Sequence, residues 1–246
     1  QWSMHQQAAG NLDSIANETF SRLSNNLKNQ KTTTEYEVQQ WIVEGLTKAD
    51  MIWEGDPICA AAQNSADPHY QPNKVGSREI AQGDVVLIDL WGKQQQPGAV
   101  YADITRMAVA ANAPTPFQEE IFNYVCQAQK KATQLVKSLW ETKKTIAGFQ
   151  IDECCRKVIE DAGYGRYFIH RTGHNIDTQD HGDGAHLDSL ETFDERLLLE
   201  NTCFSIEPGI YLPEKFGVRL EYDVFLHQDH TVTVTGGSQE EFVTLL

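Results

Sequence analysis

The sequence predicts an α+β fold in which an antiparallel sheet lies inside and helices cover one side of it. Two stretches, residues 85–109 and 203–225, each read as a pair of apolar strands joined by a turn. Amphipathic helical patterns precede both stretches, and the same order of elements occurs twice along the chain. The sequence therefore predicts an internal duplication with near two-fold symmetry.

The composition limits the class of protein. A chain of 246 residues can bury a sizeable core, and we expect one domain spanning residues 1–246. Acidic residues outnumber basic ones by 35 to 20, which argues against a nucleic-acid partner because phosphate binding requires a basic surface. No apolar run approaches the roughly 18 residues of a membrane span. Five cysteines without a CxxC pair and no visible signal peptide favour a reducing, cytoplasmic location.

The elements of the first half follow in order. Residues 4–28 carry apolar side chains close to helical spacing. Thr34 and Glu37 form a capping-box pattern that starts a second helix. Residues 58–62 read as a short strand, and the polar loop that follows holds His69.

The second half repeats this plan. A helix is expected from Pro116, because proline favours the first helical turn. A second helix is expected over residues 151–162, before Gly163. A short strand over residues 167–169 should precede a histidine-rich loop, and residues 231–235 and 242–246 have β-like patterns.

The second strand pair carries one glutamate in each strand. Glu207 and Glu221 lie 221 − 207 = 14 positions apart, and their midpoint, 214, falls in the turn. Residues equidistant from the turn of an antiparallel hairpin face each other. Two facing carboxylates among apolar neighbours repel unless a cation lies between them. This spacing therefore indicates a metal site.

The first strand pair has the same design. Asp89 and Asp103 are also 103 − 89 = 14 apart, with a midpoint beside Pro97-Gly98. His174 follows Gly173 in a loop that could bring its ring close to all four acids. One imidazole with four carboxylates suits two divalent first-row ions such as Mn²⁺, Co²⁺, Fe²⁺ or Zn²⁺, since Mg²⁺ and Ca²⁺ favour shells of oxygen alone.

The motifs of this chain resemble those of the pita-bread metallopeptidases, which include methionine aminopeptidases, Xaa-Pro aminopeptidases and prolidases. The resemblance covers nearly the whole chain and rests on NSADPHYQP, DVVLIDLWG, YADITRM, HRTGH, SIEPGIY and VRLEYD, in the family order. HRTGH and DITR are more similar to the Xaa-Pro branch than to the methionine branch. The resemblance implies the pita-bread fold, a duplicated, curved antiparallel sheet covered by helices.

The resemblance also implies a site with two divalent ions, manganese first and cobalt, zinc or iron as alternatives. Asp103 and Glu221 would bridge the ions, Asp89 would complete one ion, and His174 with Glu207 the other. Glu207 would also be the general base. His181 would stabilise the oxyanion, His69 would contact the substrate, and both would be catalytic and substrate-binding residues. Arg219 would support the site by orienting a ligand carboxylate.

The implied activity is hydrolysis of the peptide bond that precedes proline, by an Xaa-Pro aminopeptidase or dipeptidase. Two alternatives stay open: a methionine aminopeptidase-like enzyme, which the compact length favours, and a non-catalytic peptide-binding module. Asn175, Asp177 and Gly182 depart from the family pattern and affect the expected substrate pocket. In the Xaa-Pro branch an N-terminal domain helps to form a dimer. A homodimer and an upstream domain therefore stay open for a chain that begins at Gln1.

Overall fold

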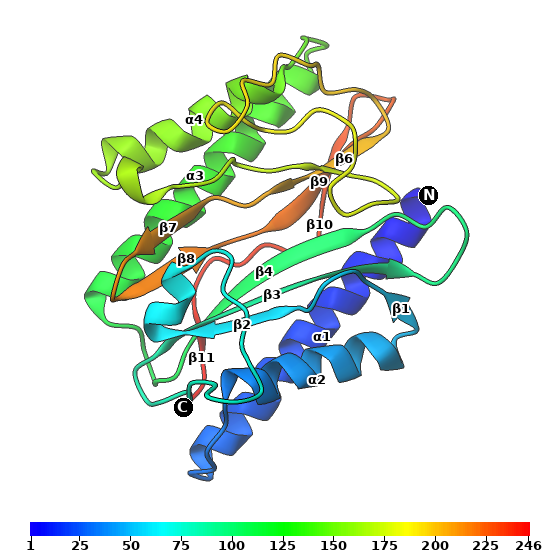
Figure 1. Ribbon diagram of the computed structural model, residues 1–246. Coiled ribbons are helices and arrows are strands. Elements are labelled where there is room, and N and C mark those ends of the chain that lie inside the picture. Colours follow the sequence, from blue (N-terminus) through cyan, green and yellow to red (C-terminus); the bar gives the residue numbers. More distant parts are fainter.

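A computed structural model describes all residues from Gln1 to Leu246. Two halves follow each other along the chain (Figure 1). The first half holds helices α1 (Trp2–Lys28) and α2 (Glu35–Lys48), followed by strands β1 (Met51–Ile52), β2 (Ile58–Ala61), β3 (Val85–Gln94) and β4 (Ala102–Val109), with a 3₁₀ turn η1 (Ala62–Ala66) after β2. None of the helices is long and apolar enough to cross a bilayer.

The second half repeats the order of the first. It begins with helices α3 (Pro116–Trp140) and α4 (Gly148–Asp161) and the 3₁₀ turn η2 (Gly165–Tyr167). The strands are β5 (Asn175–Ile176), β6 (Thr202–Ile206), β7 (Gly209–Leu212), β8 (Phe216–Arg219), β9 (Tyr222–Leu226), β10 (Val232–Thr235) and β11 (Val243–Thr244). The capping boxes at Thr34 and Thr115 fix the starts of α2 and α3.

Three sheets form the interior between the helix pairs. One contains β1, β3, β4 and β11 in that order, with β2 also paired to β3. The second has the order β10-β9-β6-β5, and the third is the β7-β8 pair. All pairings are antiparallel except that of β11 with β4. The α+β class predicted from the sequence is therefore confirmed.

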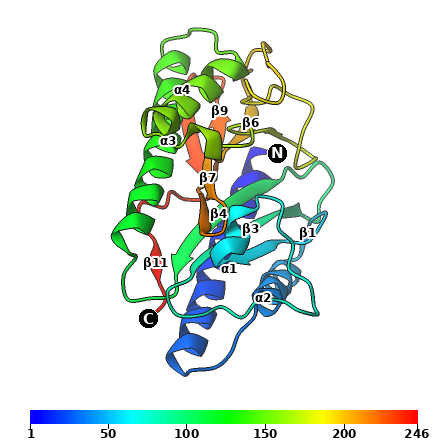
Figure 2. The ribbon, with the colours of Figure 1, turned by 60° about the vertical axis from the view of Figure 1, so that its left-hand side comes forward.

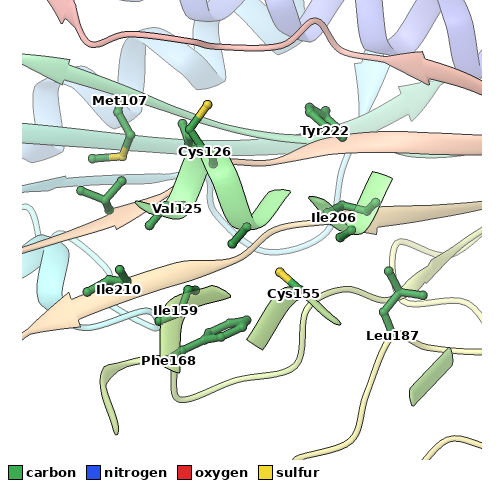
Figure 3. Packing of buried hydrophobic residues seen from close by; sticks show 14 of the residues in the cluster. Met107, Val125, Cys126, Cys155, Ile159, Phe168, Leu187, Ile206, Ile210 and Tyr222 are labelled. Atoms are coloured by element: carbon green, nitrogen blue, oxygen red, sulfur yellow. The ribbon is translucent and has the colours of Figure 1, made fainter. Parts of the chain in front are cut away.

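Strand β3 is buried on both faces, and alternation sorts its side chains between two cores. Val86, Ile88 and Leu90 pack with α1 and α2, whereas Val85 and Leu87 belong to the core of the second half. Asp89 shares the face of Val85 and Leu87, so the strand turns its carboxylate towards the other half. Figure 3 shows that second core, where side chains of α3 and α4 meet those of β6 and β7.

The strand predicted over residues 167–169 is wrong. Residues 165–167 form η2 instead, and the backbone then continues without a sheet partner. The Arg156 guanidinium from α4 donates hydrogen bonds to the carbonyls of Phe168 (2.9 Å) and His170 (2.8 Å). These carbonyls are thus bound by a side chain and not by a neighbouring strand.

Candidate metal centre

A cavity of about 690 Å³ opens where the two halves meet. Its wall contains parts of β3, β4, β8 and the loops that carry the histidines, and Figure 2 shows β3 and β4 between the two helix pairs. Every site residue predicted from the sequence lines this cavity: His69, Asp89, Asp103, His174, His181, Glu207, Arg219 and Glu221.

The first hairpin carries its acids in a different register from the predicted one. Asp89 pairs with Thr105, and Asp103 pairs with Trp91, so the two acids do not face each other. The loop from 95 to 101 shifts the centre of the hairpin to position 97, one residue beyond the expected midpoint. Because both acids have the same parity, they still share a face as diagonal neighbours.

The second hairpin keeps the predicted register but is interrupted at its glutamates. Gly209 pairs with Arg219, and Ile206 pairs with Tyr222, which are both centred on position 214. Glu207 and Glu221 occupy the break between these two ladders. The backbone at these two residues is thus held by paired strands at both ends of the break.

His174 is positioned by its own backbone and by β6. Its N–H donates to the Ser205 hydroxyl (3.0 Å), and its carbonyl accepts from the Ser205 N–H (2.9 Å). Its Nδ1 lies 3.2 Å from the Asn175 carbonyl, which can only accept, so Nδ1 carries the proton. The bare Nε2 then faces Asp103 Oδ2 (3.7 Å) and Glu207 Oε1 (3.5 Å).

The donor atoms of this cluster fit a divalent cation. Asp103 Oδ1 and Glu221 Oε1 are buried and have no hydrogen-bond partner. One atom each from Asp103, His174 and Glu221 lies within 4.8 Å of the others. Burial, and then the charge of Glu221, raises the pKa of Asp103 well above its usual value. Buried carboxylates without a counter-charge are costly, and a divalent cation bound between them would neutralise their negative charge.

Arg219 lies at the base of the centre, 4 % exposed. Its Nη2 donates to Asp89 Oδ2 (2.6 Å), its Nε to the Thr105 hydroxyl (2.9 Å) and its Nη1 to the Tyr211 hydroxyl (3.0 Å). The Thr105 hydroxyl in turn lies 3.0 Å from Asp89 Oδ1 and 2.7 Å from Glu221 Oε2. Arg219 and Thr105 together connect acids from both halves, engaging both oxygens of Asp89 and leaving Glu221 Oε1 without a partner.

His69 and His181 line the cavity away from the buried acids. His69 is exposed in the loop after η1, and its N–H donates to Asp67 Oδ1 (3.0 Å). His181 stacks on His174 with 3.9 Å between ring centroids. Partial burial, and then the neighbouring His174, lowers the pKa of His181 to about 3. His181 is therefore neutral at physiological pH.

Two buried acids hold the loops that carry these histidines. Glu35 accepts from the Ala61 N–H (2.6 Å), the Asn64 amide and the Tyr70 hydroxyl, on either side of the η1 loop. Asp152 in α4 accepts from the backbone N–H groups of Thr172 and Ser189, both at 2.9 Å. Each half thus uses a carboxylate from its second helix to fix its loop.

Several residues that line the cavity or support it from behind escaped the sequence analysis. Thr105 could have been found, because it lies two residues after Asp103 in the same strand and therefore shares its face. Asp180 lines the cavity, with an unpartnered Oδ1, but it lies in a loop whose path the sequence does not specify. Tyr211 and His170 meet through a 2.7 Å hydrogen bond between segments 41 residues apart, which no local pattern indicates.

With this geometry in place, comparison with known proteins is direct. A model of metallopeptidase family M24 matches residues 7–228. The chain belongs to metallopeptidase family M24. Two M24 relatives are the Xaa-Pro dipeptidase of Pyrococcus furiosus (33% identical, 75% of this chain, 48% of the relative) and that of Lactobacillus delbrueckii subsp. lactis (32%, 90% and 54%).

Solved structures of M24 relatives share the fold. The X-Pro aminopeptidase of Thermotoga maritima has a TM-score of 0.81 at 27% identity, and the alignment covers 99% of this chain and 63% of that one. The Thermococcus sibiricus prolidase has a TM-score of 0.79 at 29% identity, covering 99% and 60%. The pita-bread fold implied by the motifs is thus confirmed. The chain spans about half the length of the curated relatives it matches.

Proposed function

We propose that this chain is the catalytic domain of a two-metal exopeptidase that hydrolyses the peptide bond preceding proline. The observation that carries the proposal is that eight side chains at the family's functional positions line one cavity. Relatives named Xaa-Pro dipeptidase and Xaa-Pro aminopeptidase support the choice of substrate. We also propose that residues 1–246 form a single domain and that the protein assembles as a homodimer. A cytoplasmic location is part of the same proposal, and all five cysteines are free.

The residues that would hold two divalent ions, manganese first, are the four acids and the histidine that line the cavity at the predicted positions: Asp89, Asp103, His174, Glu207 and Glu221. When bound, such ions supply a water molecule of lowered pKa and polarise the scissile carbonyl. Asp103 and Glu221 each keep one buried carboxylate oxygen without a partner, and these oxygens would be available to hold the ions. Arg219 and Thr105 would hold the acids in place.

The remaining steps belong to side chains that reach the cavity. Burial raises the pKa of Glu207 to about 7, a value suited to a general base at neutral pH. Glu207 would take a proton from water and return it to the leaving nitrogen. The neutral His181 would donate a hydrogen bond to the developing oxyanion. His69, on the exposed side of the cavity, would contact the substrate beside the scissile bond.

The test is hydrolysis of three peptides by metal-stripped protein before and after addition of Mn²⁺. An Xaa-Pro dipeptide and an Xaa-Pro-Yaa tripeptide report on the proposed activity, and Met-Ala-Ser reports on methionine aminopeptidase activity. We expect Mn²⁺ to restore cleavage of the proline peptides alone, with the preferred length separating dipeptidase from aminopeptidase. Cleavage of Met-Ala-Ser alone, or cleavage of none of them by protein that holds two metals, would contradict the proposal.

A further inference from the structure

A second group of ligand-type atoms adjoins the proposed centre. Nitrogen atoms of His174 and His181 and a carboxylate oxygen of Asp180 lie within 4.8 Å of one another. Two imidazoles and a carboxylate are a common set for zinc. This group shares His174 with the five proposed ligands, so an ion bound here would compete with the catalytic arrangement.

The Arg171 side chain decides which nitrogen of His181 carries a proton. Arg171 Nη2 lies 3.1 Å from His181 Nδ1. Arginine has donors and no acceptor, so Nδ1 must accept with its lone pair. A neutral imidazole has one N–H, which is then at Nε2. Nε2 is also the atom nearest to Asp180, at 3.8 Å from Oδ2.

The two stacked histidines therefore hold opposite tautomers. The Asn175 carbonyl keeps the proton of His174 on Nδ1, which leaves Nε2 free to ligate a metal. Arg171 keeps the proton of His181 on Nε2, which leaves that nitrogen a donor with no lone pair for a metal. In a doubly protonated His181 the Nδ1–H would point at another donor, so the contact with Arg171 favours the neutral ring.

We propose that Arg171 is a positioning residue that sets the Nε2–H tautomer of His181, which makes this histidine a hydrogen-bond donor and withholds it from metal. His181 then cannot combine with Asp180 and His174 to trap an ion. The role of this donor in catalysis rests on the proposed function, whereas the tautomer itself does not.

The Arg171 guanidinium has no acidic partner that would draw it away from His181. No carboxylate lies within ion-pair distance of it, and His181 is its one side-chain partner. The backbone is fixed separately, since the Arg171 N–H donates to Glu191 Oε1 (3.2 Å) and its carbonyl accepts from His170 Nδ1 (2.7 Å). Replacement of the side chain should thus leave the segment in place.

The first readout is ¹⁵N NMR of the histidine rings in metal-free protein, with His181 assigned by comparison with His181→Gln. We expect the Nε2–H tautomer in the wild type and in Arg171→Lys, which keeps a donor, and a mixture of tautomers in Arg171→Met. Arg166→Met, which removes an exposed arginine beside Tyr167, is the matched control. An unchanged His181 spectrum in Arg171→Met would overturn the proposal.

The second readout is the number of Zn²⁺ ions bound per chain in excess zinc. Arg171→Met should bind an additional, weaker ion that is lost again in the double variant with Asp180→Asn, whereas Arg171→Lys should match the wild type.

With an Xaa-Pro peptide, Arg171→Met should lower kcat about ten- to a hundredfold and change KM little, because a transition-state donor is weakened. A rise in KM alone, or unchanged zinc binding, would contradict the inference. Absence of peptide hydrolysis by the wild type would contradict only the proposed function, since the NMR and zinc results do not depend on it.

Discussion

The two halves of the molecule repeat one plan but fix their parts differently. In the first half a continuous hairpin, β3–β4, carries Asp89 and Asp103 within its ladder. In the second half the strands separate into two ladders, and Glu207 and Glu221 lie in the break. A side chain in a ladder is held rigidly by its neighbours, whereas one in a break can extend into a cavity. We infer that the first half supplies scaffold ligands and the second half the group that moves a proton.

The same contrast appears in the acids that anchor the loops. Glu35 has no cationic partner, and burial raises its pKa. Asp152 forms an ion pair with Arg156 at 3.1 Å, and both side chains are almost fully buried. The loop of the second half, which carries the proposed metal ligand His174, is thus held by an ion pair, whereas that of the first half is held by a carboxylate that accepts only from uncharged donors.

The largest expected effect is on Glu207, the proposed general base, which lies in the second half. Glu207→Gln keeps the shape of the side chain but removes its basicity, so kcat for an Xaa-Pro peptide should fall about a thousandfold or more. Glu214→Gln, in the exposed turn of the same hairpin, is the matched control. Steady-state kinetics with unchanged circular dichroism checks this, and a fall of less than tenfold would remove Glu207 from the role of base.

The next prediction compares the loss of stability when each of the two anchoring acids, Asp152 and Glu35, is replaced. Asp152→Asn leaves the Arg156 guanidinium without its partner, so we expect a loss of about 3–5 kcal/mol in the free energy of unfolding. Glu35→Gln replaces a carboxylate oxygen that accepts hydrogen bonds with an NH2 group that can only donate, and should cost about 1–3 kcal/mol. Asp161→Asn, which breaks an exposed pair on the same helix as Asp152, should cost less than about 1 kcal/mol.

Urea unfolding of the three variants measures this comparison. Equal losses for Asp152→Asn and Glu35→Gln would show that the two anchors are equivalent, against the contrast drawn between the halves.

A smaller effect, on Mn²⁺ affinity, is expected at Thr105, whose hydroxyl links acids from the two halves. Thr105→Val removes the hydroxyl between Asp89, Glu221 and Arg219 and leaves a side chain of similar shape. Loss of such a supporting group should weaken Mn²⁺ binding about ten- to a hundredfold. Thr244→Val on the exposed strand β11 is the control. Unchanged affinity in calorimetric titration would show that Thr105 does not orient the acids.

The last prediction, which concerns acids of both halves, is the pH dependence of metal binding. Burial raises the pKa of Glu207 to about 7 and those of Asp103 and Glu221 well above their usual values in the metal-free protein. Protons bound at pH 5.5 must leave when a metal binds, so Mn²⁺ affinity should rise with pH, by about tenfold per unit for each proton released. Titrations at pH 5.5, 6.5 and 7.5 measure the slope. A flat profile would contradict the raised pKa values.

Much of the fold was readable from the sequence because its patterns are local. The helix starts at Thr34 and Pro116 and the turn centred on position 214 each depend on a few adjacent residues. The predicted register of the first hairpin was wrong because it assumed that Asp89 and Asp103 face each other, which centres the hairpin on position 96, whereas the strand pairing centres it on Pro97.

The candidate site was readable only in part. Its acids stand out as charges within apolar strands, and Asp89 is an example. The contacts of Arg171 with His181 and of Tyr211 with His170 depend on how loops cross in space. A local sequence pattern does not indicate which loops meet in space, so the contacts of these side chains were not predicted.

The most direct test of the account is the number of Mn²⁺ ions that the metal-free chain binds, measured by calorimetric titration and elemental analysis. If both halves build one centre, the wild type should bind two ions per chain. Asp89→Asn in the first half and Glu221→Gln in the second should each reduce that number or weaken binding at least tenfold. A chain that binds no ion, or that binds two with undiminished affinity in both variants, would contradict the shared centre.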